Sequence, residues 1–188
     1  TVFPLGSENL LARYSNWTQS AADCRKRIER GRTFRTDAIE FQDRLAIVML
    51  SAGFDADVVR RVHEHRTSHI TRWAYRFQIL RSWMEYRWAP MEVLLSDNPI
   101  SHSADKADPK VRSFSADWVF AFNYPIYATG LQIIQQADPT DGVVDIGFFE
   151  RSGPVSGLFQ YLSVARGTHS KRSDWRQFRT THFAIKPQ

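Results

Sequence analysis

Residues 116–123 read ADWVFAFN and residues 143–149 read VVDIGFF, and these two apolar runs decide the fold. Both runs are rich in aromatic and β-branched residues, and turn residues separate them, which is typical of buried strands joined by short connections. Residues 91–96, MEVLLS, predict another strand. Strands therefore dominate the second half of the chain.

Further elements follow from apolar periodicity and capping residues. We expect additional strands at 45–54, 130–134 and 176–185, and helices at 8–14, 18–31, 55–66, 70–89 and 154–166. Residues 97–115 are polar and predict a loop or a hairpin tip. Because helices cluster early and strands late, the predicted fold class is α+β: an antiparallel β-sandwich with a helical insert.

Composition narrows the class of protein. The 188 residues suit one domain with a buried core, and a single cysteine, Cys24, favours a reducing compartment. No stretch is apolar enough for a membrane span, so we expect a cytoplasmic protein without a transmembrane segment. The net charge is +5 and arginine outnumbers lysine, which suits phosphorylated ligands, nucleic acid or anionic membrane surfaces alike.

The first residues, TVFPLGSENLLARY, predict a strand, a tight turn at Gly6 and a helix capped by Ser7. The backbone N–H groups at such a helix start commonly hold a phosphate. The same pattern also fits an ordinary capped helix, and both interpretations remain open.

Four stretches, in this order, resemble the diacylglycerol kinase family of lipid kinases, which shares a superfamily with sphingosine kinases and NAD kinases. They are PLGSENLLAR (4–13), SAGFDADV (51–58), NYPIYATGLQI (123–133) and ADPTDGVVDI (137–146), with RGTH (166–169) at a family-like spacing. The resemblance implies a lipid-kinase β-sandwich. The family's GGDGT and DGE motifs do not occur in this sequence. We therefore expect a fragment that lacks most of the N-terminal α/β nucleotide-binding domain, with residues 1–16 as the tail of that region and 17–188 as the sandwich.

The resemblance also implies site residues. Gly6, Ser7 and Asn9 fall on the Gly, Thr and Asn of the family's last nucleotide-binding motif, which implies ATP as cofactor, while Leu10 replaces an acidic residue there. The two acidic motifs assigned to chemistry are absent, so we expect no catalytic residue in this chain.

The turn DPTDGVVD carries three carboxylates and suits a hard cation such as Mg²⁺, although it also fits a plain Asp-Gly turn. The resemblance implies that Asp141 binds Mg²⁺ through its carboxylate, and Asp138 and Val143 through their carbonyls. Asp145 alternates into the following strand and is expected to be structural.

Two other polar groups have alternative interpretations. Asp55 and Asp57 could serve a substrate, or Asp55 could cap a helix. His63, His65 and His69 suggest a metal site, but no cysteine or carboxylate partner stands at ligand spacing, which disfavours it.

The resemblance implies an ATP- and Mg²⁺-dependent kinase that phosphorylates the hydroxyl of diacylglycerol or a similar lipid at the membrane surface, and we expect this chain to be inactive alone. A sphingoid-base or other lipid acceptor, a non-catalytic scaffold and a homo-oligomer stay open. The alternative from another class, less favoured, is a nucleic-acid-binding module, because arginines and aromatics interleave between residues 60 and 88.

The predicted helix at 70–89 has two apolar stripes. We expect one stripe to face the sandwich: Ile70, Trp73, Phe77, Leu80 and Met84. The opposite stripe either touches a membrane or is buried by a neighbouring element: Tyr75, Ile79, Trp83 and Tyr86.

Overall fold

The structure is a computed structural model that describes residues 4, 9–17, 20–64, 79, 81–100, 109–150 and 153–188. The labelled helices are α1 (Leu10–Tyr14), α2 (Ala21–Glu29), α3 (Phe54–Glu64) and α5 (Pro154–Ala165), with 3-10 turns at Ala128–Gly130 and His169–Lys171. The strands are β1 (Ile39–Phe41), β2 (Arg44–Ala46), β3 (Met49–Gly53), β4 (Met91–Ser96), β5 (Arg112–Ala116), β6 (Trp118–Phe122), β7 (Val144–Phe149), β8 (Trp175–Thr180) and β9 (His182–Pro187).

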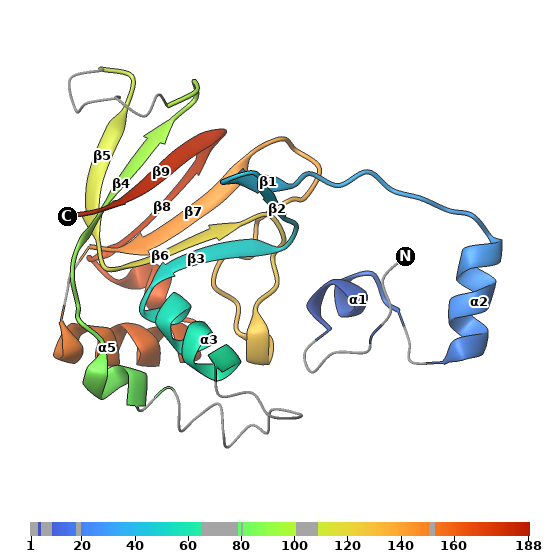
Figure 1. The fold of residues 1–188 in the computed structure, drawn as a ribbon, viewed down its shortest axis with the longest axis horizontal. Coiled ribbons are helices and arrows are strands. Elements are labelled where there is room, and N and C mark those ends of the chain that lie inside the picture. The colour runs from blue at the N-terminus through green and yellow to red at the C-terminus, as the bar shows by residue number, and fades with distance from the viewer. Residues whose placement is uncertain are drawn as a thin grey trace.

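Two antiparallel sheets form the body of the molecule (Figure 1). One has four strands in the order β3-β6-β7-β8, and the other has three in the order β5-β4-β9. The short hairpin of β1 and β2 turns at Gln42 and Asp43, which both have positive φ angles. The predicted α+β sandwich is confirmed.

Strand β6 lies at the centre of the packing, and all five of its residues are buried because both of its faces are covered. Val119 and Ala121 point into the sandwich, where they meet Val93 of β4 and Ile146 and Phe148 of β7. Small and aliphatic side chains suit this position, because packed sheets stand only about 10 Å apart.

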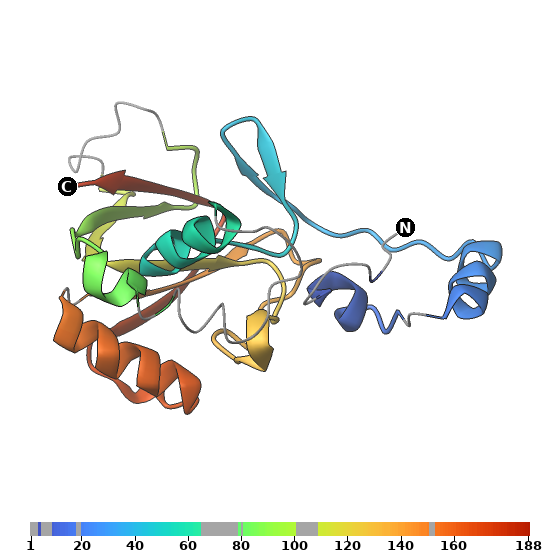
Figure 2. The ribbon, with the colours of Figure 1, turned by 60° about the horizontal axis from the view of Figure 1, so that its bottom comes forward.

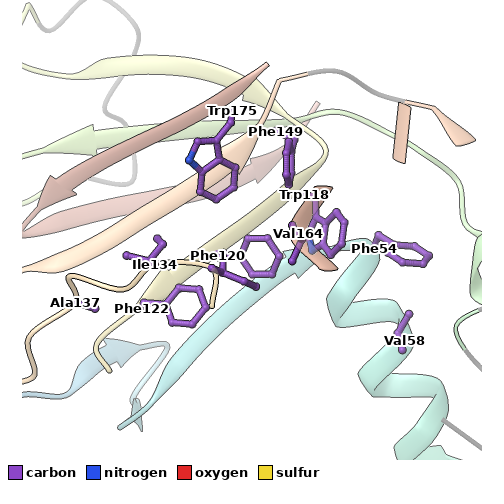
Figure 3. Packing of buried hydrophobic residues seen from close by; sticks show 11 residues of the cluster. Phe54, Val58, Trp118, Phe120, Phe122, Ile134, Ala137, Phe149, Val164 and Trp175 are labelled. Carbon is purple, nitrogen blue, oxygen red and sulfur yellow. The ribbon is translucent and has the colours of Figure 1, made fainter. Parts of the chain in front are cut away.

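The opposite face of the four-stranded sheet is aromatic and is covered by helices (Figures 2 and 3). Trp118 and Phe120 of β6 pack with Phe54 of α3 and Val164 of α5. Figure 1 shows α3 and α5 beneath this sheet, and α1 and α2 to the right of the sandwich.

At two places the chain passes from one sheet to the other, and each time a single residue separates the two strands. Asp117 separates β5 from β6, and Thr181 separates β8 from β9. The prediction of one strand at 176–185 was therefore wrong, because half of that run belongs to each sheet. Residues 45–54 are likewise divided: β2 holds 45 and 46, β3 holds 49–53, and Phe54 begins α3.

Other boundaries also differ from the predictions. Residues 131–134 form no strand, although Ile133 and Ile134 are buried, because an irregular segment there fills the core. Helix α1 follows Asn9 rather than Ser7, and α2 is capped by Ser20 rather than Thr18, since the Ser20 hydroxyl accepts a hydrogen bond from the Asp23 amide at 3.3 Å.

The expected orientation of the 70–89 helix is wrong where the structure describes it. Residues 81–85 are helical, but Trp83 and Tyr86 pack onto the aromatic cluster, while Met84 is 72% exposed. Trp83 meets the Phe54 ring edge-on, with 5.6 Å between the centroids. Of the two interpretations of the stripe opposite the sandwich, burial by a neighbouring element is therefore the one that holds for Trp83 and Tyr86, which are half-buried against Phe54 of α3. Residues 70–78 and 80 lie outside the described part of the chain.

Candidate functional site

Residues 123–134 contact two of the other motif stretches, 51–58 and 166–169, as well as residues on either side of α2. The Asn123 amide donates to the carbonyls of Asp37, at 2.8 Å, and Ile47, at 2.7 Å. The hydroxyls of Tyr124 and Thr36 are 2.7 Å apart, and the Tyr14 ring at the end of α1 meets the Tyr124 ring edge-on at 4.9 Å. The segment is therefore bound to the chain on both sides of α2.

Tyr127 connects this segment to the start of α3. Its hydroxyl donates to the Asp55 carboxylate, which is 6% exposed. Burial raises the pKa of Asp55, while hydrogen bonds from Ser51 and Tyr127 partly counter that rise. The capping role predicted for Asp55 is wrong, since Asp55 lies within the first turn of α3 and accepts from a distant side chain.

His169 connects the RGTH stretch to the same segment. Its Nε2 lies 2.8 Å from the Ile133 carbonyl, and its ring meets Trp175 edge-on at 4.9 Å. The imidazole is buried, so it acts here as a fixed link between β8 and the irregular segment before β7.

The acidic turn before β7 is held by residues that the sequence did not single out. The Asp37 carboxylate accepts from the Gly142 amide at 2.7 Å, and the Asp37 amide donates to the Pro139 carbonyl at 2.7 Å. Gly142 has a φ of 74°, a left-handed conformation that favours glycine. The turn thus has a defined shape that depends on Asp37.

Within this turn, Asp141 accepts a hydrogen bond from the Val143 amide at 3.1 Å and pairs with Arg179. Asp138 turns toward Thr140, whose amide lies 2.9 Å from its carboxylate. A carboxylate beside turn carbonyls is a donor set that Mg²⁺ accepts, so the residues fit the ion. Arg179 would compete with it for Asp141.

Asp145, in β7, is 1% exposed, and its carboxylate lies 4.0 Å from Nε of Arg179, which also pairs with Asp141. Burial raises its pKa, the Arg179 charge lowers it and the Asp141 charge adds to the rise. Its burial agrees with the structural role that we expected.

Asp57 belongs to an ion-pair network along α3. Burial alone would raise its pKa, but hydrogen bonds from Arg60 and Arg61 outweigh this and hold the pKa below its usual range. Arg61 also pairs with Glu85, as does Arg81. These three arginines of the stretch that suggested nucleic acid are therefore engaged with carboxylates.

Other predicted site residues remain predictions. Gly6, Ser7, His65 and His69 lie outside the described residues. Asn9 is the left-handed residue before α1, with a φ of 49°. Among the described residues, no three His, Cys, Asp or Glu side chains gather as metal ligands, which does not bear on a site with one carboxylate.

Asp117, at the crossing between the sheets, is a buried acid that sequence reasoning missed. It is fully buried, and neither carboxylate oxygen makes a well-formed hydrogen bond within the described part of the chain. Burial raises its pKa to about 7; nearby backbone amides partly counter this, and the Asp174 charge adds to it. Nothing in the sequence marks Asp117 as different from a surface turn residue.

The other side-chain contacts of the site could be predicted from the sequence only in part. Tyr127 lies in a stretch that carried the resemblance, yet no pattern paired it with Asp55. Asp37 and Arg179 lie in stretches of weak alternation, and only the tertiary fold brings them to the turn.

The arrangement is a β-sandwich of two antiparallel sheets with helices on one face. Residues 48–188 match the family model described as the YegS C-terminal NAD kinase beta sandwich-like domain, and the chain belongs to this family.

Solved structures with the same fold come from Bacillus anthracis str. Sterne. A diacylglycerol kinase has 16% identity and a TM-score of 0.60, covering 97% of this chain and 55% of that one. Two chains provisionally named diacylglycerol kinases have 14% identity, with TM-scores of 0.61 and 0.59, covering 97% and 96% of this chain and 56% and 54% of theirs. This chain thus spans about half the length of those structures. No curated protein matches it.

Proposed function

We propose that this chain is the sandwich part of a lipid kinase that transfers the γ-phosphate of ATP to the hydroxyl of diacylglycerol or a related lipid. Membership of the family supports a kinase fold, and the named relatives support the lipid class. The observation that carries the proposal is that two of the resembling stretches, 51–58 and 166–169, contact a third, 123–133, through Asp55 and His169, although they are far apart in the sequence.

In this proposal the chain positions substrates and supplies no catalytic group. Gly6, Ser7 and Asn9 complete the site for ATP. Asp55, buried against Tyr127, orders the start of α3 and the adjoining end of β3. Phosphoryl transfer depends mainly on such positioning and on electrostatic stabilisation.

We also propose Mg²⁺ at the acidic turn, held by Asp141 through its carboxylate and by Asp138 and Val143 through their carbonyls. When bound, the ion would supply positive charge that fixes the turn. Asp37 already orients the same turn through the Gly142 amide.

The activity test compares the 188-residue chain with a longer protein that contains it and the GGDGT and DGE motifs. Each is incubated with ATP, Mg²⁺ and either diacylglycerol or a sphingoid base in mixed micelles, and phosphorylated lipid is measured. We expect product from the longer protein with one of the lipids and none from the chain alone. Turnover by the chain alone would contradict the proposal that the catalytic groups belong to the GGDGT and DGE motifs. No turnover by the longer protein would overturn the proposed function.

The metal test uses thermal unfolding with and without EDTA. Chelation should lower the melting temperature of the wild type but not of Asp141→Ala, because the mutant has no carboxylate for the ion. The matched control is Asp145→Asn, which should be less stable but should still respond to EDTA. If Asp141→Ala responds as strongly as the wild type, the ion is not at this turn.

A further inference from the structure

Helix α5 presents an apolar outer face. Val155 is 69% exposed, Leu158 45% and Phe159 56%, and Leu162 is partly exposed beside them. Their spacing of three, four and seven residues places them on one side of a helix. Contiguous exposed apolar side chains of this kind mark an interaction surface, whereas single ones do not.

The inner face of α5 is fixed, so the outer face cannot turn inward. Gln160 and Val164 are buried, and a Cβ atom at Gly157 would lie 2.2 Å from a ring carbon of Trp88. The helix therefore packs against the segment of Trp88 through its small residue. Its large apolar residues remain outside.

The segment of α5 and the turn after it contain basic but no acidic residues, with Glu150 before the segment and Asp174, which pairs with Arg172, after it. Helix α5 contains no charged residue, and residues 151–173 contain no Asp or Glu but do contain Arg151, Arg166, Lys171 and Arg172. Arg166 and Lys171 are exposed, and Arg166 follows Phe159 by seven residues, so it continues the same face at the end of the helix. Apolar side chains followed by cations suit the interface of an anionic bilayer.

A protein partner fits this surface less well. A second copy packed face to face would offer no acid within residues 151–173 to pair with Arg166 and Lys171. One face of a 12-residue helix, about 18 Å long, also offers far less than the roughly 800 Å² per partner of a stable interface.

We propose that the outer face of α5, comprising Val155, Leu158, Phe159 and Leu162 with Arg166 and Lys171, is the surface by which this protein contacts an anionic membrane. The proposal rests on the proposed function, since a lipid kinase has to reach a bilayer. It places the contact on a different element from the Trp83 and Tyr86 stripe, which is half-buried against the aromatic cluster.

The test measures co-sedimentation of the purified chain with vesicles of phosphatidylcholine alone or mixed with phosphatidylglycerol. The wild type should bind the mixed vesicles more tightly, and Leu158→Ser plus Phe159→Ser should weaken binding about tenfold or more. The matched control is Phe41→Ser plus Leu45→Ser, which removes two exposed apolar side chains from the β1–β2 hairpin and should bind as the wild type does.

A charge variant provides a second measurement. Arg166→Glu plus Lys171→Glu keeps the apolar face and should abolish the preference for phosphatidylglycerol. Circular dichroism and thermal unfolding confirm that each variant is folded.

Several results would overturn the proposal: a folded wild type that ignores the mixed vesicles, equal losses in the α5 and hairpin variants, or full binding by the α5 variant. A wild type that sediments as a dimer without lipid, and an α5 variant that is a monomer, would assign the face to a second copy. If the longer protein phosphorylates no lipid, including a water-soluble short-chain diacylglycerol, while α5 still governs vesicle binding, the proposed function fails but the membrane surface stands.

Discussion

Two apolar helical faces on the same side of the four-stranded sheet have opposite environments. The face with Trp83 and Tyr86 is packed onto Phe54, whereas the face with Leu158 and Phe159 on α5 is open. Both faces have helical periodicity in the sequence. The difference teaches that periodicity identifies residues that share a face, while the fold decides which face is covered.

Among variants that compare the two faces, Trp83→Ala should cause the largest loss in the free energy of unfolding. Removing this ring takes away one of the edge-on partners of Phe54 and one of those of Trp88 and leaves a cavity in the aromatic cluster, so we expect a loss of about 3 kcal/mol in the free energy of unfolding. Leu158→Ala, on the open face, should stay within about 0.5 kcal/mol. Urea unfolding of both variants measures the difference, and similar losses would contradict it.

A pH titration sharpens the same comparison, because the covered side contains a buried acid and α5 contains no carboxyl group. The pKa of Asp117 is raised from 3.8 to about 7 in the folded state. Between these values the folded state keeps a proton that the unfolded state releases, so stability should fall as the pH rises from about 4 to about 7.

Asp117→Asn should reduce this slope, and Leu158→Ser should leave it unchanged. The measurement is the melting temperature at a series of pH values. An undiminished slope in the Asn variant would show that other acids, such as Asp55 and Asp145, cause it; the pKa values of both are also raised by burial.

Tyr127→Phe, on the helix-covered side of the sheet, should cause a smaller loss in the free energy of unfolding. The variant keeps the ring and removes the hydroxyl that donates to Asp55, so we expect a loss of about 1.5 kcal/mol. The loss should be greater at high pH than at low pH, because the hydrogen bond from Tyr127 stabilises the charged form of the Asp55 carboxylate. A loss of equal size at all pH values would mean that Asp55 stays protonated.

Much of the fold could be predicted from the sequence because its central elements have strong local patterns. Strands β4, β6 and β7 and helix α5 lie close to their predicted positions, since each is an apolar run with turn residues at its ends. The patterns fail where one residue changes the chain's sheet. Thr181 looks like any strand residue, yet it separates β8 from β9.

Less of the candidate site could be predicted. The resemblance identified the stretches, and the fold brings them together, but the pairs that join them are distant in sequence. Tyr127 with Asp55 and Asp37 with Gly142 are examples. A hydrogen bond across such distances depends on the packed sheets, which no local pattern encodes.

The pairing of β4 with β9 has a consequence for the time course of synthesis. Met91 pairs with Pro187 and Ser96 with His182, so the central strand of the smaller sheet finds its second neighbour only after roughly 90 more residues. At ribosomal rates of about 5–20 residues per second, β4 spends on the order of 5–20 seconds with an unpaired edge. During that interval the β5 hairpin protects only one side of β4, and the nascent chain offers the other to chaperones or to neighbouring chains.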